Sequence, residues 1–125
     1  MRKQYFFRSS PDGMLAWDVD RLVDLTRALP VRAVPLSEIR ELDEVRVTDD
    51  DGHPITWRGF VEHAALMHAA DLAYPIILAA DGAVMDGRHR VAKALLERRA
   101  TIDAVQFAED PVPDFVGRDP DDLPY

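Results

Sequence analysis

The segment PIILAADGAVMDGRHRVAKALLERRATIDAVQF, residues 75–107, decides the fold class, because runs of strand length flank one helical run. The first run, 75–80, is continuously apolar, which is typical of a strand buried on both faces. An Asp-Gly turn then leads to a short strand at 83–85. A helix is expected over 87–98 and a closing strand over 100–107. Within the helix, the residues expected to face inward are Val91, Ala94 and Leu95.

Further elements are predicted before this segment. Asp18 can cap a helix that Pro30 ends, and 31–36 predicts a strand followed by a helical turn. A second helix is expected to start near Thr56. Its predicted buried stripe consists of Trp57, Phe60, Val61 and Ala64. Together these elements predict an α/β (α+β) chain in which helices pack on a small mixed β-sheet.

The remaining segments are less regular. Residues 43–57 could form a hairpin, because Val45 and Val47 alternate before an Asp-Gly turn. Residues 1–13 are expected to form a polar lead-in to the first helix. We predict one domain over 1–108 and an acidic, proline-rich tail over 109–125, laid over the domain by aromatic side chains. These side chains are Phe115 and Tyr125.

Composition excludes several classes of protein. The chain of 125 residues has 23 acidic and 15 basic side chains, and its net charge is −8. An extended DNA-binding face needs clustered Lys and Arg, so DNA is not an expected partner. There is no cysteine, which removes disulfides and thiol chemistry. No apolar run is long enough for a membrane span and no signal peptide is recognised, so a cytoplasmic protein is expected.

The start of the helix at 87–98 carries the candidate site. Arg88, His89 and Arg90 fall in the first turn, where the helix dipole disfavours cations. A bound anion would remove this repulsion, and Gly87 would let it approach the backbone N–H groups. The alternative is that Arg88 and Arg90 pair with acidic side chains such as Asp86 and that His89 is packed. The spacing of these residues alone does not decide between the bound anion and the ion pairs.

Residues 82–107 resemble the signature segment of the ParB/sulfiredoxin-like superfamily, and the likeness extends more weakly over 31–107. Gly87, His89 and Arg90 match the Gly-x-His-Arg version of the motif, in which the family holds nucleotide phosphates. VRAVPLSEIRELDE, residues 31–44, is similar to the earlier segment that feeds the same pocket. The catalytic cysteine of sulfiredoxins is replaced by Arg88, which rules out that activity. The helix-turn-helix domain of ParB proteins has no counterpart here.

The free-serine-kinase members of the family are the closest template in motif. The resemblance implies binding of ATP or ADP with Mg²⁺ and a phosphotransferase acting on a small hydroxylated metabolite. Asp86 would then orient the site or bind the metal, and Asp43 or Glu44 would be the base. The alternatives are that Asp86 is a helix cap and that the acidic residues near 43 form a solvated turn. A non-catalytic nucleotide-sensing or protein-interaction module is the second hypothesis.

Two residues of the second predicted helix complete the candidate site. Arg58 and His63 could line a pocket wall opposite the phosphate-binding turn. His63 and His68 are five residues apart, which does not suit a shared metal ion. Packing or solvation is the alternative for both His63 and Arg58.

Overall fold

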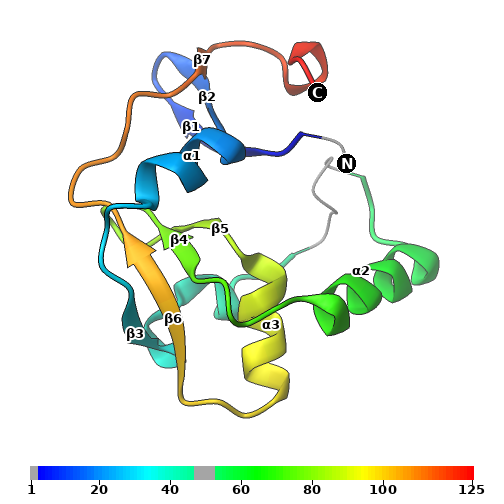
Figure 1. Ribbon diagram of the computed structural model, residues 1–125. Coiled ribbons are helices and arrows are strands. Elements are labelled where there is room, and N and C mark those ends of the chain that lie inside the picture. Colours follow the sequence, from blue (N-terminus) through cyan, green and yellow to red (C-terminus); the bar gives the residue numbers. More distant parts are fainter. Residues whose placement is uncertain (1–2, 47–52) are drawn as a thin grey trace.

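The chain folds into three α-helices and two β-sheets over the residues described by the computed structural model, 3–46 and 53–125 (Figure 1). The predicted α+β class is therefore confirmed. The α-helices are α1 Val19–Thr26, α2 Trp57–Ala69 and α3 Arg88–Leu96. The strands are β1 Tyr5–Ser10, β2 Gly13–Asp18, β3 Arg32–Pro35, β4 Ile76–Leu78, β5 Val84–Asp86, β6 Thr101–Gln106 and β7 Phe115–Val116. Short 3₁₀ turns follow β3, η1 Leu36–Glu38 and η2 Arg40–Asp43, and a third, η3 Pro120–Asp122, lies near the C-terminus.

The larger sheet has the strand order β3-β6-β4-β5. β4 and β6 run parallel, whereas β3 is antiparallel to β6 and β5 is antiparallel to β4. β4 is central and every residue of it is buried, as its continuous apolar sequence predicts. The predicted strand before Pro35 and the closing strand after Thr101 pair with each other.

Apolar side chains cover both faces of this sheet because successive residues of β4 point to opposite sides. Ile76 and Leu78 pack with Val91 and Ala94 of α3 in one cluster. Ile77 packs in a second cluster that includes Trp17 and Leu22. Among the α3 residues expected to face inward, Val91 and Ala94 are buried, but Leu95 is 53% exposed and that prediction is wrong.

The segment before Gly13 was expected to be a polar lead-in, but its residues Tyr5–Ser10 form a strand. β1 and β2 pair in an antiparallel hairpin whose turn contains Gly13. β2 also pairs with β7, so the segment after residue 108 adds a strand to this second sheet. The expected aromatic cover is present: the Tyr5 ring lies 6.0 Å from that of Phe115 and 5.2 Å from that of Tyr125. Trp17, which is buried, donates from Nε1 to the carbonyl of Pro111 over 2.8 Å.

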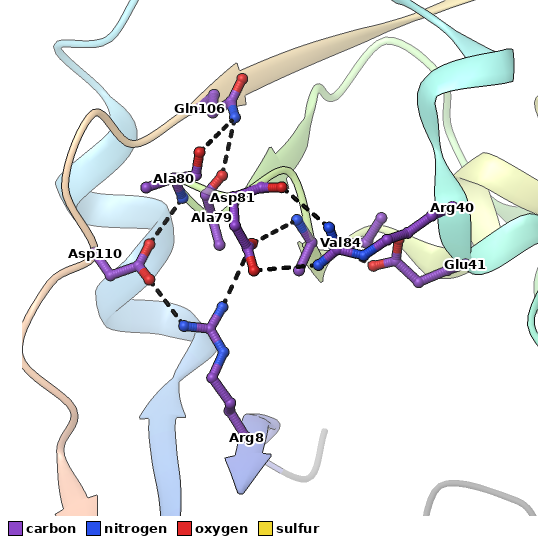
Figure 2. A network of polar contacts seen from close by, with 10 residues as sticks. Arg8, Arg40, Glu41, Ala79, Ala80, Asp81, Val84, Gln106 and Asp110 are labelled. Carbon is purple, nitrogen blue, oxygen red and sulfur yellow. Dashed lines mark hydrogen bonds and ion pairs between the residues drawn. The ribbon is translucent and has the colours of Figure 1, made fainter. Parts of the chain in front are cut away.

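A polar network ties the hairpin to the larger sheet (Figure 2). Arg8 of β1 donates to Asp110 over 2.9 Å and lies 3.7 Å from Asp81 in the turn between β4 and β5. The same carboxylate, Asp81, pairs with Arg40 of η2 at 3.2 Å. Asp110 in turn accepts from the backbone N–H of Ala80. The side chains of Arg8, Arg40 and Asp110, from three separate segments, thus converge on the β4–β5 turn.

The predicted cap of α1 and the predicted start of α2 are confirmed. Asp18 accepts from the backbone N–H of Asp20 at the start of α1, and Thr56 accepts from that of Gly59 at the start of α2. α1 ends at Thr26, four residues before Pro30.

The predicted buried stripe of α2 is wrong. Trp57, Phe60 and Val61 are exposed and Ala64 is only half-buried, because α2 packs mainly against α3 rather than on a sheet. None of the helices in the described ranges is both long and apolar enough to cross a membrane. Of the predicted hairpin, 47–52 lies outside the described residues, and Val45 is exposed in irregular chain.

Candidate functional site

The candidate site lies at the turn from β5 into α3. Gly87 is the N-cap of α3 and has φ 108°, a left-handed conformation that L side chains rarely adopt. A Cβ built on Gly87 would lie 2.5 Å from Cγ2 of Ile76 in β4. Glycine is therefore required both by the backbone angle and by the close packing of the turn on the sheet.

Arg90 holds this turn in place. Its Nη2 lies 2.9 Å from Oδ2 of Asp86, and its Nη1 donates to the carbonyls of Tyr74 and Pro75 over 3.0 and 2.7 Å. The side chains of Arg90 and Asp86 are 16% and 21% exposed. The pairing with Asp86, which the sequence left as the alternative to an anion ligand, is thus what the structure shows for Arg90. Asp86 supports the turn through this ion pair and does not cap α3.

The N-terminus of α3 has an unusual combination of features. No side chain of the described residues caps it, and its first turn holds no acidic residue. Arg88 at the first position is exposed, and His89 is half-buried. The backbone N–H groups of this turn and two basic side chains are therefore concentrated at one point of an acidic protein.

The structure brings His63 of α2 next to His89. The two imidazole rings are 4.7 Å apart with an interplanar angle of 48°. Lys93 also joins the two helices, since its Nζ donates to the carbonyls of His68 and Ala70 at the end of α2. Of the two residues predicted to form a pocket wall, His63 therefore lies beside the turn.

Arg58 has a different position. It is exposed and lines a surface hollow of about 410 Å³ with Trp57, Val61 and Glu62, all of them in α2. A separation of five residues, or 500° of helical rotation, places Arg58 and His63 on different faces of α2. The structure does not bring Arg58 to the Gly87 turn.

The predicted bases lie on the segment that follows β3. Asp43 ends η2 and Glu44 follows it, and both are exposed. Within residues 3–46 and 53–125, no hydrogen bond or ion pair joins either carboxylate to the Gly87 turn. The neighbouring Glu41 does contact β5: its Oε2 accepts from the backbone N–H of Val84. Sequence reasoning assigned Glu41 only to a solvated turn, and its spacing carries no signal for this contact.

Residues 3–46 and 53–125 hold no group of three or more His, Asp or Glu side chains placed to bind a metal ion. Mg²⁺ that is bound to nucleotide phosphates needs only one or two protein carboxylates, and Asp86 is the carboxylate next to the turn. A metal ion there would share Asp86 with Arg90.

No match was found. The chain was compared with protein-family models, with curated proteins and with solved structures. The assignment to the ParB/sulfiredoxin-like superfamily accordingly stays a prediction from the motif, and function is argued below from the site itself.

Proposed function

We propose that the Gly87 turn binds the phosphate groups of a nucleotide, ATP or ADP. The backbone N–H groups of residues 88–90 would donate to the phosphate oxygens, and the side chains of Arg88 and His89 would add positive charge. The single observation that carries this proposal is the start of α3 at a left-handed glycine, with basic residues in the first turn and no cap from a side chain of the described residues. Arg90 and Asp86 are positioning residues in this account, since both are engaged in holding the turn.

The order of elements around the turn supports the proposal. β5, the glycine, α3 and β6 follow one another as in the ParB/sulfiredoxin-like segment that the sequence resembles. The proposal therefore includes a ParB/sulfiredoxin-like fold as the scaffold that holds the site. The contact of His63 with His89 adds a second imidazole close to the place where the phosphates would lie.

Phosphoryl transfer to a small hydroxylated metabolite is the catalytic form of this proposal. Mg²⁺ would arrive on the nucleotide phosphates, with Asp86 beside it. Asp43 or Glu44 would accept the proton of the substrate hydroxyl as its oxygen attacks the terminal phosphorus. The bond from that phosphorus to the bridging oxygen would break, and the shortened nucleotide would leave.

A non-catalytic nucleotide sensor is the second candidate, and two observations favour it. Asp86 is already paired with Arg90. Asp43 and Glu44 are exposed on a different segment. Partitioning-type DNA binding is disfavoured by the excess of acidic side chains.

Titration calorimetry with Mg²⁺ and ATP, ADP, AMP or adenosine tests the binding proposal. We expect binding of ATP and ADP, with adenosine much weaker, and a loss of about tenfold in affinity in Arg88→Ser. Arg99→Ser, at the other end of α3, is the matched control and should bind like the original chain. Equal affinity in both variants, or no heat with any nucleotide, contradicts the proposal.

A turnover assay separates the two candidates. The protein is incubated with Mg-ATP or Mg-ADP and a pool of hydroxylated metabolites, and phosphorylated products are measured. Product formation that is lost in Asp43→Ala or Glu44→Ala supports the phosphotransferase. Nucleotide binding without product supports the sensor.

A further inference from the structure

One face of α2 is apolar, and no residue of the described ranges covers it. Trp57 is 94% exposed, Phe60 69% and Val61 68%, and these side chains occupy adjacent positions one turn apart. No residue of α2 is buried, because its inner side meets mainly α3, through half-buried residues such as Ala64 and Met67. Figure 1 shows α2 to one side of the larger sheet, away from the hairpin.

The uncovered area is large for one helix. Aromatic side chains of this size present roughly 150–250 Å² each, so Trp57, Phe60 and Val61 together expose on the order of 400 Å². A contiguous apolar patch of this size on a small chain is typical of an interaction surface. Leu66, 57% exposed, lies nine residues after Trp57 and therefore on the opposite side of α2, so it is not part of this face.

We propose that a second copy of this chain covers the face, through an antiparallel pair of α2 helices related by a twofold axis. Charge is the first argument. Arg58 and Glu62 lie one turn apart on one flank of the apolar face. An antiparallel twofold pair places Arg58 of one copy opposite Glu62 of the other, and Glu62 opposite Arg58. The flank is thus complementary to itself and carries no net charge.

Shape is the second argument. The hollow of about 410 Å³ is lined by Trp57 and Val61 on one side and by Arg58 and Glu62 on the other. Trp57 and Val61 form one row along the helix, with successive members four positions apart, and Arg58 and Glu62 form the neighbouring row. The groove between two such rows accepts a row of side chains from a facing helix. Because the pair is isologous, each copy offers both the groove and the row that fills it.

The size of the exposed apolar face of α2 agrees with a weak dimer. About 400 Å² of apolar surface on each copy, with the stems of Arg58 and Glu62 at its edge, approaches the lower limit of specific interfaces, about 1,000 Å² in total. Dissociation constants in the micromolar range are expected for an interface of this size. Anionic lipid surfaces would repel a chain of charge −8, and so they fit the patch less well.

Sedimentation equilibrium of the full chain, from low micromolar to submillimolar concentration, tests this proposal. The weight-average mass is expected to rise from one copy to two. Trp57→Ser should weaken association by at least about tenfold, since each dimer loses two anchors. Val112→Ser removes an apolar side chain that is 76% exposed outside α2, and it should change nothing.

Charge reversal gives the sharper test. Arg58→Glu and Glu62→Arg should each weaken the dimer, and the double variant should restore it, because the reversed charges face each other again. A monomer at every concentration, a dimer indifferent to Trp57→Ser, or a double variant weaker than both single ones overturns the proposal. Binding of Trp57 to lipid vesicles without a change in mass also overturns it. Nucleotide binding by Trp57→Ser, measured separately, reports on the Gly87 turn alone.

Discussion

The guanidinium of Arg90 lies 2.9 Å from the carboxylate of Asp86, four residues before it in the chain. The same guanidinium donates to the carbonyls of Tyr74 and Pro75, which precede β4. One side chain therefore fastens the end of β5, the start of α3 and the entry to β4 to one another. Arg90, which the sequence motif predicts to bind phosphate, instead holds the Gly87 turn in this structure.

Arg90→Ala is accordingly expected to destabilise the fold. It leaves Asp86 and two carbonyls without their donor in a site that is mostly buried, which costs about 2–3 kcal/mol in the free energy of unfolding. Arg99→Ala is the control, since its ion pair with Glu97 is half exposed, and it should cost less than about 0.5 kcal/mol. Urea unfolding followed by circular dichroism measures both. Equal losses in the two variants would show that the Arg90 contacts do not hold the turn.

Gly87→Ala is expected to cost more than Gly82→Ala. Both glycines have positive φ, 108° and 90°, so each substitution carries a backbone penalty of about 1–2 kcal/mol. Only at Gly87 does the added Cβ also collide with Ile76, whereas Gly82 has open space around it. The collision adds roughly 1–3 kcal/mol, and the difference between the two unfolding free energies measures it. Similar losses in both variants would remove the steric argument.

Acid should weaken the network around Asp81. The backbone N–H of Ala83 donates to Asp81 and lowers the pKa of this carboxyl, and Arg40 acts in the same direction while partial burial opposes it. The unfolded chain then binds more protons than the folded one, so the stabilisation is complete above the ordinary pKa of Asp, about 3.9, and is lost as pH falls through the lower folded value.

Thermal unfolding between about pH 5 and pH 3 tests this dependence. Asp81→Asn keeps an oxygen that can accept from Ala83, and it removes the titrating group. Its melting temperature should fall less steeply with acid than that of the original chain. Parallel curves would show that Asp81 contributes nothing to acid sensitivity.

Trp17→Phe should loosen the attachment of the segment after residue 108. The substitution removes the Nε1 donor to Pro111 and shrinks a fully buried side chain, at a cost of about 2–3 kcal/mol. Trp57→Phe, at an exposed position, should stay within about 0.5 kcal/mol. Unfolding by urea, monitored through the remaining tryptophan in each variant, gives the comparison. A small effect at Trp17 would indicate that residues 109–125 are held by other contacts.

Local signals in the sequence predicted much of the larger sheet. The apolar run before Ala79, the cap at Asp18 and the start of a helix near Thr56 each depend on neighbouring residues only, and each is confirmed. The N-terminal hairpin was missed, although Pro11-Asp12-Gly13 between aromatic and apolar runs is a hairpin signal.

Other features could not be derived from periodicity. The spacing of Trp57, Phe60 and Val61 shows that they share a face, but it carries no information on whether another element covers that face. Arg90 is a similar case: its carbonyl partners lie fifteen and sixteen residues earlier in the chain, and only the packing of β4 beside α3 brings them within reach. The contact of Glu41 with Val84 likewise joins segments that are distant in sequence.

The central claim is that the first turn of α3 binds phosphate, and backbone amide NMR during a titration with Mg-ADP tests it most directly. The account predicts that the amide signals of Arg88, His89 and Arg90 shift most, saturably, and that those of Glu97 and Arg98 at the other end of the helix stay in place. Unchanged signals at residues 88–90, at concentrations that saturate any binding elsewhere on the chain, would contradict the account.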